Sequence, residues 1–304
     1  MNMHRIVFAL PALLLLAQAS ADGQQSRTRP RDARSRIDTT FAFDRRGTVS
    51  LSATHGDIIV TGSSRDEIHV RATSDDDNLR LTTSASRVSL DVFGSHRGDT
   101  RFEVTVPYGA RVSVRTQSGD IAVRGSRGPV EIQSSSGDIE VDDVVGRLDV
   151  NALSGEIKAR TINGDVSINA TNGEITVIDA TGAVEAKTVS GDVTLRNIVS
   201  RSVRAGTMSG EVGFDGAIDP GGHYDLSSHS GDVTLRIPRD ANAQLTVSTW
   251  SGSVDSEFPI TLRPGEHGIG TASAKHFTFA IGAGSARITL ESFSGDVTIR
   301  SRPR

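Results

Sequence analysis

The sequence has 304 residues but no cysteine, and aromatic residues make up only 4% of it. Without cysteine the chain can form neither disulfides nor thiolate metal sites, and it offers no cysteine for lipid attachment. So few aromatic residues do not suit a bulky globular core, and they favour a thin core of Val, Ile, Leu and Ala. The formal net charge of −4 gives no general affinity for nucleic acid or for anionic membranes.

Long apolar runs are also scarce. The only one extends from Ile6 to Ala17, and no later segment is apolar enough to span a bilayer. Arg5 precedes this run and Ala19-Ser20-Ala21 follows it, which predicts a signal peptide over residues 1–21. The run is short for a transmembrane helix. We therefore expect an exported chain, periplasmic or at the cell surface, with no transmembrane anchor after cleavage.

The residues that follow divide into two kinds of sequence. Five arginines among Gln, Ser, Thr and Pro predict a basic, disordered linker over residues 22–36. From Ile37 to about Val114 apolar and polar residues alternate, as in Val88, Leu90 and Val92, which indicates strands. We expect less regular coils over residues 37–118.

A nine-residue repeat begins at Gly119. Its units read GDIAVRGSR, GPVEIQSSS, GDIEVDDVV and so on, with positions 3 and 5 apolar, as in Ile121 and Val123. Position 8 is often apolar too, although positions 7 to 9 together with the glycine are expected to make the corner. The examples are Val144, Leu153, Ile162, Val189, Ile198 and Met208.

This unit predicts a short strand followed by a corner. Positions 3 and 5 point to one side of the strand, and a glycine supplies the backbone angles of the corner. A single unit cannot bury its own apolar face, so the units must stack. Ser-Gly-Asp or Ser-Gly-Glu recurs most clearly at every second unit. The sequence therefore predicts an all-β, single-stranded parallel β-solenoid (β-helix) with about 18–21 residues per coil, built from nine-residue half-coils.

One glycine marks each predicted corner. These structural turn glycines are Gly119, Gly137, Gly155, Gly164, Gly173, Gly191, Gly210, Gly231, Gly252 and Gly295. After the regular repeat (119–215), Ser-Gly recurs at 230, 251 and 294, which we interpret as longer coils of about 21 residues. Pro220, Pro238, Pro259 and Pro264 place the insertions in loops. Strands near Phe41 and the tail 300–304 are the expected caps of a solenoid domain spanning 37–304, with its longer coils and C-terminal cap in 216–304.

The acid after each corner glycine is the most suggestive chemical feature. Because two units make one coil, these acids stack along one edge as a carboxylate ladder. The ladder comprises Asp120, Asp138, Glu156, Glu174, Asp192, Glu211 and Asp232. Neighbouring charges about 4.8 Å apart repel by about 1 kcal/mol in water, which invites a cation. The order of Gly, Asp and apolar residue differs from calcium-binding nonapeptides, however, so we favour hydrogen bonding within the turns.

Other chemistries find weaker support. Paired carboxylates suggest a glycosidase, but these acids recur at every coil instead of clustering once. Sugar-degrading β-helices line their clefts with aromatic residues, and here we note only Trp250, Tyr108 and Tyr224. His223 and His229 flank a predicted 216–230 loop and could share a metal, although this spacing is a weak signal. We expect no catalytic residue and no cofactor.

Three stretches carry a family resemblance. They are RFEVTVPYGARVSVRTQSGDIAV (101–123), VTLRIPRDANAQLTVSTWSGSVDSEFP (233–259) and GAGSARITLESFSGDVTIRSRPR (282–304). The chain resembles a bacterial adhesin-like family of unknown function with Ser-Gly-Asp-Ile/Val repeats, over most of residues 40–304. That resemblance implies a β-solenoid, an envelope or surface location and no catalytic residues to transfer. Ser253 stands where the pattern has an acid.

The sequence thus leaves three functions open. The leading one is a non-enzymatic, exported envelope or surface protein that presents a polar face to an unknown macromolecule, such as an envelope or surface polysaccharide or protein, but not nucleic acid. The second is a polysaccharide-binding or polysaccharide-acting β-helix, which a cluster of aromatics and acids on one face would support. The third is a periplasmic, stress-associated structural protein.

Overall fold

The computed structural model describes residues 35–75, 79–92, 100–259 and 275–302. The predicted signal peptide and residues 22–34 of the predicted linker lie outside these ranges, as does Pro264. Residues 33–304 form one compact unit. Its first strand, β1, begins at Ser35, so Ser35 and Arg36 belong to the solenoid and not to the linker.

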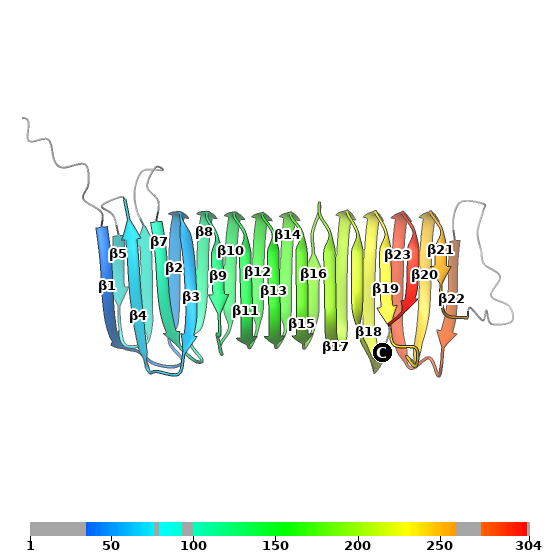
Figure 1. Ribbon diagram of the computed structural model, residues 1–304, viewed down its shortest axis with the longest axis horizontal. Helices are drawn as coiled ribbons and strands as arrows, with labels where there is room; N and C mark the ends of the chain where they lie inside the picture. The colour runs from blue at the N-terminus through cyan, green and yellow to red at the C-terminus, as the bar shows by residue number, and fades with distance from the viewer. Residues whose placement is uncertain (1–34, 76–78, 93–99, 260–274, 303–304) are drawn as a thin grey trace, which may run out of the picture. The chain divides into compact units, whose positions relative to one another are not determined.

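The described chain is all β-strand, and the strands stack side by side as coils of a parallel β-solenoid (Figure 1). In the regular region each residue pairs with its counterpart two units later, as Val130 does with Leu148 and Ile139 with Ile157. Each coil contributes one strand to each of two faces. The predicted fold and the coil of two nine-residue units are confirmed.

The pre-corner face holds the strands that run into a Ser-Gly corner. In spatial order these are β5 (Leu79–Thr83), β6 (Arg87–Val92), β2 (Thr48–His55), β8 (Arg111–Ser118), β10 (Val130–Ser136), β12 (Leu148–Ser154), β14 (Val166–Asn172), β16 (Val184–Lys187), the second halves of β17 (Val193–Ser209) and β18 (Val212–Ser230), β23 (Ala286–Ser294), β20 (Ala243–Ser251) and β22 (Lys275–Ile281).

The post-corner face holds the strands that leave the corner. In the same order these are β1 (Ser35–Ala42), β4 (Glu67–Ser74), β7 (Thr100–Pro107), β3 (Asp57–Ser63), β9 (Ile121–Arg124), β11 (Ile139–Val145), β13 (Ile157–Asn163), β15 (Ile175–Thr181), the first halves of β17 and β18, β19 (Val233–Ile237), β24 (Val297–Ser301) and β21 (Val254–Ser256).

The core is a single apolar layer between the two faces. Positions 3 and 5 of every repeat unit supply it, and Ile139 and Val141 are typical in being almost wholly buried. The chain thus fills its interior mainly with Val, Ile, Leu and Ala, together with a few aromatic side chains such as Phe102, Phe214 and Tyr224.

Position 8 behaves differently on the two faces. Val144, Ile162 and Ile198, on the post-corner face, are buried, whereas Leu153, Val189 and Met208, on the pre-corner face, are about half exposed. The apolar residues at position 8 therefore belong to the core only in every second unit.

A left-handed residue at position 7 explains the difference. Asp143 (φ 52°), Thr161 (φ 55°), Asp179 (φ 56°) and Asn197 (φ 58°) all lie at this position on the post-corner face. One left-handed residue interrupts the alternation of side chains, so position 8 turns inward. Asp and Asn tolerate this conformation, whereas the β-branched Thr161 is strained there.

Residues 216–230 are not the predicted loop. They form most of strand β18, which includes Pro220. This strand begins on the post-corner face and passes through a corner into the pre-corner face. Pro238 does lie beyond a strand, directly after β19, and Pro259 follows β21.

Near each end of the solenoid, the order of the coils in space differs from their order in the sequence. Residues 286–301 (β23 and β24) lie between the coil of β18 and β19 and that of β20 and β21 (Figure 1, red between yellow and gold). The Ser-Gly at 294 therefore stacks directly on that at 230, and the one at 251 lies beyond it. The interpretation of the spacing after Ser230 as two successive longer coils is thus wrong.

The N-terminal end has the same arrangement. β2 and β3 lie between the coil of β6 and β7 and that of β8 and β9. Antiparallel pairs occur at both ends: β1 with β4, β4 with β7 and β5 with β6 at one end, and β22 with β20 at the other. The tail residues Arg300 and Ser301 pair with β19 inside the stack, so the expected cap formed by residues 300–304 is wrong over its described part.

The corner glycines stack backbone on backbone. A Cβ at Gly155 would lie 2.1 Å from the carbonyl oxygen of Gly137, and Gly155 itself has φ +119°. Gly164 belongs to the opposite corner, where its Cβ would lie 2.2 Å from the oxygen of Gly146. Each of the two corners of this coil therefore has a position with room only for glycine.

We predict that Gly155→Ala destabilises the protein by about 3 kcal/mol or more, because the methyl group overlaps a backbone oxygen that cannot rotate away. Gly213→Ala is the matched control: it lies within β18, and a Cβ there has nothing within 4 Å. Thermal unfolding followed by circular dichroism measures both. Equal melting temperatures for the two variants would contradict the assigned role of the corner.

Candidate functional site

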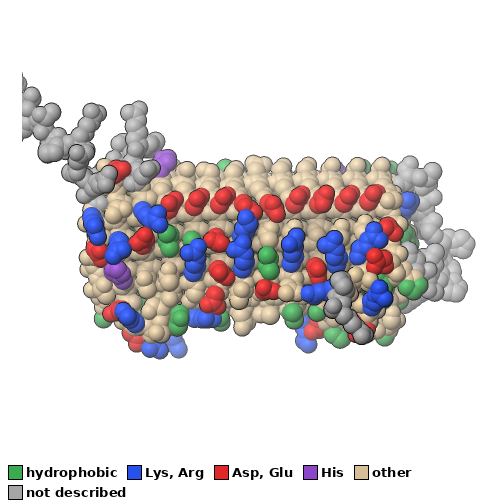
Figure 2. All heavy atoms as spheres, viewed as in Figure 1, with side chains coloured by type: hydrophobic (Ala, Val, Ile, Leu, Met, Phe, Trp, Pro, Cys, Tyr) green, Lys and Arg blue, Asp and Glu red, His purple; other side chains and the backbone are tan. Residues whose placement is uncertain are grey.

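The carboxylate ladder is built into the corners. Asp120 Oδ1 accepts a hydrogen bond from the Asp138 amide (2.9 Å), and Asp138 Oδ1 accepts one from the Glu156 amide (2.9 Å). Asp192 holds the amide of Glu211 in the same way (2.8 Å). Figure 2 shows a row of acidic side chains running along the stack. Each aspartate in these pairs ties its own corner to the next.

The ladder continues through the inserted C-terminal coil. Asp232 Oδ1 accepts the Asp296 amide (2.8 Å), and Asp296 Oδ1 accepts the Ser253 amide (2.7 Å). The bond from Ser253 holds the pKa of Asp296 below its ordinary value. Ser253, which departs from the repeat at the acid position, therefore still serves as the donor.

Arginines of the post-corner face neutralise a different acid. Arg160 (2.7 Å) and Arg124 (3.0 Å) both donate to Glu140, and these bonds lower its pKa, that from Arg160 the most. Arg124 and Arg160 therefore neutralise Glu140, which lies outside the ladder. Lys158 does reach a ladder acid, Glu156 (2.6 Å).

The sequence suggested two possible metal sites, the carboxylate ladder and the pair His223 and His229. Among the described residues no group of three or more His, Asp or Glu side chains is arranged to hold a metal ion. His223 contacts Arg287 (3.2 Å) and His229 stacks on Phe293, so the two histidines have separate partners. Cation binding along the ladder stays a prediction.

The most distinctive surface feature is a line of outward side chains that we call the exposed row. It consists of the residue directly before each Ser-Gly, Asn-Gly or His-Gly corner on the pre-corner face. In spatial order the row reads Thr54, Gln117, Ser135, Leu153, Thr171, Val189, Met208, His229, Phe293 and Trp250. It is polar at the N-terminal end and becomes apolar and aromatic at the other.

Most of the exposed large apolar side chains among the described residues belong to this row. Leu153, Val189, Met208, Phe293 and Trp250 are 44–56% exposed, and the remaining two are Tyr108 and Val199. Tyr224, by contrast, is buried and donates its hydroxyl to the Ser200 carbonyl oxygen (2.6 Å). Exposed apolar side chains gathered in one line mark an interaction surface.

Three rings at the C-terminal end of the row are stacked. The centroids of His229 and Phe293 lie 4.8 Å apart with planes inclined by 11°, and those of Phe293 and Trp250 lie 6.1 Å apart with planes inclined by 2°. Adjacent coils bring Trp250 and Phe293 together although the two residues are far apart in the sequence. Trp250 ends this stack, so one of its ring faces is not covered by Phe293.

A groove runs beside the aromatic end of the row. It has a volume of about 420 Å³, and Trp250 and Phe293 form one wall. Its other lining groups are polar or charged and include Ser227, Ser248, Glu291 and Lys275. The groove forms because the residue before each row member, such as Thr249 or Ser292, turns inward and is buried.

A second groove lies at the same place in the N-terminal coils. Its volume is about 410 Å³, and its lining includes Gln117, Ser135, Gln133 and Asn151. The coil geometry thus makes the groove, while the row residues give each end its chemistry.

The sequence does carry a signal for this site, which our sequence analysis missed. The last four corners read Met-Ser-Gly, His-Ser-Gly, Trp-Ser-Gly and Phe-Ser-Gly. Trp250 was considered only as one of three scattered aromatic residues, and Phe293 was not considered as a site residue. Position 8 faces outward only on the pre-corner face, because units on the post-corner face contain a left-handed residue at position 7. The sequence does not show which units contain that residue, so this signal alone does not identify the row.

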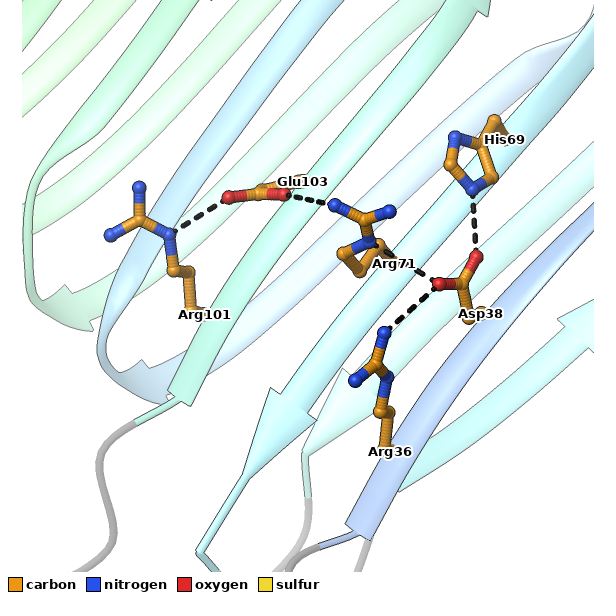
Figure 3. A network of polar contacts seen from close by, with 6 residues as sticks. All are labelled: Arg36, Asp38, His69, Arg71, Arg101 and Glu103. Carbon is orange, nitrogen blue, oxygen red and sulfur yellow. Dashed lines mark hydrogen bonds and ion pairs between the residues drawn. The ribbon is translucent and has the colours of Figure 1, made fainter.

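A polar network covers the N-terminal edge strands (Figure 3). Asp38 contacts His69 (2.8 Å), Arg36 (3.2 Å) and Arg71 (3.3 Å), and Arg71 also reaches Glu103 (3.5 Å). These partners, His69 first, lower the pKa of Asp38 to about 2. The network therefore ties β1 to β4 and β4 to β7.

Two matches of one family model, to residues 47–197 and 179–300, cover almost all of the solenoid. The chain belongs to the Toastrack DUF4097 family. Toastrack domains are β-solenoids of unknown function, in agreement with the adhesin-like resemblance. No curated protein sequence is significantly similar to this Toastrack chain.

Solved structures of low similarity carry the same kind of description. A putative adhesin from Parabacteroides distasonis is 9% identical, with 88% of this chain and 97% of that one covered and a TM-score of 0.43. One from Bacteroides fragilis is 12% identical with the same coverage and a TM-score of 0.39. A putative cell adhesion protein from Clostridium sporogenes is 8% identical, covers 88% and 100%, and has a TM-score of 0.23. These similarities are too low to assign a function.

No helix of the described residues is long and apolar enough to cross a membrane.

We predict that Asp138→Ala lowers stability by about 0.5–1.5 kcal/mol, because the Glu156 amide loses its acceptor. Asp138→Asn keeps an acceptor oxygen and relieves repulsion between neighbours, so it should melt at or above the wild-type temperature. Millimolar calcium should leave the wild-type melting temperature unchanged. A rise with calcium that Asp138→Asn abolishes would instead identify the ladder as a cation site.

We predict that Asp38 makes the N-terminal edge sensitive to acid. A carboxyl with a pKa of about 2 in the folded chain and about 3.9 when unfolded stabilises the fold above pH 4, and this contribution is lost as the pH falls toward 2. Asp38→Asn should therefore lower the melting temperature at pH 6 but not at pH 2. Asp240→Asn, in the turn after β19, is the control, and a constant Asp38→Asn deficit at both pH values would refute the prediction.

Proposed function

We propose that the mature chain is an exported, non-enzymatic binding module of the cell envelope or surface, adhesin-like in role, which holds a macromolecular partner at the aromatic end of the exposed row. The observation that carries the proposal is the convergence of Met208, His229, Phe293 and Trp250 on one outward line. The signal-like residues 1–21 support export.

The composition of the row supports binding. Exposed tryptophan, phenylalanine and methionine are costly in water, and they are enriched where proteins contact partners. The row positions are not needed for folding, since Thr54, Gln117 and Ser135 occupy them equally well at the other end. A structural requirement therefore does not account for the aromatic side chains.

The acids support a non-enzymatic role. Asp120, Asp138, Asp192 and Asp232 each hold a backbone amide of the next coil, so their place in the structure is explained by turn bonding. A general acid or base requires a carboxyl set apart from its neighbours by its surroundings, whereas these repeat with one geometry.

A retention experiment tests the proposal. The mature protein is passed over immobilised peptidoglycan, lipopolysaccharide, outer-membrane vesicles and host extracellular matrix. We expect retention on at least one of these, and we expect the double variant Trp250→Ala/Phe293→Ala to lose it. The matched control, Gln117→Ala/Ser135→Ala, changes the same row at the polar end and should be retained like the wild type.

Two results would overturn the proposal. Retention on none of the four materials removes the binding function. Equal retention of both double variants removes the aromatic end as the binding surface. Circular dichroism of each variant confirms that the exposed substitutions leave the solenoid folded.

A further inference from the structure

We propose that the partner held at the aromatic end is a glycan: an extended, uncharged oligosaccharide chain that lies in the groove with pyranose rings against Trp250 and along the Met208–Phe293 ledge. This inference rests on the proposed binding function and names its ligand. The groove and its lining carry the argument.

The groove offers the two kinds of contact that sugars use. A pyranose ring has apolar C–H faces and a rim of hydroxyl groups. Trp250, at the end of the ring stack and 56% exposed, presents an aromatic surface, and Ser227, Ser248 and Glu291 present hydroxyl and carboxylate groups across the groove. Aromatic walls with a few polar groups that fix orientation are typical of ligand sites.

The spacing suits a repeating chain. Each coil adds one row residue and one groove residue, and coils follow one another at about 4.8 Å. An extended chain of β-linked pyranoses advances by about this distance per sugar. One sugar can therefore lie beside each coil from Met208 to Trp250, against the ring edges of His229 and Phe293 and the outer ring face of Trp250.

A peptide fits the same groove less well. Peptides that bind sheets as added strands need unpaired backbone groups at a sheet edge. β23, in the floor of the groove, pairs with β18 on one side and β20 on the other, and β20 also pairs with β22. The ligand must therefore bind through side chains, as a hydroxyl-rich chain does.

A second copy of the protein and a charged surface also fit poorly. The apolar part of the row, from Leu153 to Trp250, is one side chain wide and about 30 Å long, far less than the roughly 800 Å² per partner of a stable dimer. The groove lining has one carboxylate, Glu291, and one ammonium group, Lys275, while Asp232 and Asp296 lie at the corner beyond the row. The groove therefore has no excess of positive charge to attract a polyanion or an anionic bilayer, and both charged groups can form hydrogen bonds with uncharged sugars.

Trp250 is the only tryptophan in the chain, so its fluorescence reports on this site alone. The mature protein is titrated with chitohexaose, cellohexaose, a mannohexaose and hexagalacturonate. We expect a saturable blue shift with at least one uncharged hexasaccharide, a weaker response to the matching disaccharide, and no response to hexagalacturonate.

Two variants that keep Trp250 locate the ligand. Phe293→Ala removes the ring between His229 and Trp250 and should weaken the affinity for the responding hexasaccharide by about tenfold. Gln117→Ala, at the same row position in the polar groove, should leave the affinity unchanged. An equal effect of both substitutions would overturn the assignment of the sugar to the aromatic groove.

The retention material separates this inference from the proposed function. Bound envelope material is treated with protease or with a reagent that cleaves its glycan: periodate for sugars with vicinal diols, and lysozyme for peptidoglycan, whose 4-linked amino sugars have none. Retention that survives protease and is lost after the glycan is cleaved supports a glycan. Retention lost after protease, with no fluorescence response to any glycan, overturns the glycan and leaves the binding function standing. Retention on no material overturns both.

Discussion

The whole structure depends on how closely consecutive corners approach. At Gly119, Gly155 and Gly191 an added methyl carbon would lie only 2.0–2.2 Å from the glycine carbonyl oxygen of the preceding coil. Hydrogen bonding between stacked strands sets the coil spacing at about 4.8 Å, and at that spacing only glycine fits these corners. The aspartate after the glycine then reaches the next coil's amide, and the apolar pair after that enters the core. The corner, the carboxylate ladder and the core all depend on the close stacking of glycine corners on adjacent coils.

That constraint explains why so much of the fold could be predicted. Glycine, acid and two apolar residues recur at a fixed period, and each has a local physical reason. The orientation of position 8 could not be predicted because it depends on a left-handed residue, and Thr161 occupies that conformation against its own preference. Pairing with the neighbouring coils overrides the conformational preference of Thr161, because Asp143, Asp179 and Asn197 adopt the left-handed conformation at the same position.

The order of the terminal coils could not be predicted for a different reason. Every coil presents the same corner and the same apolar pair, so Val297 can pair equally well with any strand of the post-corner face by pattern alone. It lies between Val233 and Val254, both of them distant in the sequence. The antiparallel strand β22 pairs with the outer edge of β20 and covers it. Because that edge is taken, β23 and β24 lie on the inner side of β20 and β21. Periodic sequence determines the coil and leaves the order of its ends to the irregular segments.

The same periodicity separates structural from functional positions. Inside a coil, glycine, aspartate and the apolar pair have fixed duties, whereas the residue before each corner faces solvent and lies beside its counterparts on adjacent coils. Threonine, glutamine and serine stand there in the first coils, and methionine, histidine, phenylalanine and tryptophan in the last ones. Since the backbone is alike at both ends, folding gives no reason for the change from polar to aromatic side chains. A partner that contacts one end of the groove does give such a reason, and the insertion of β23 places Phe293 directly between His229 and Trp250 to complete that surface.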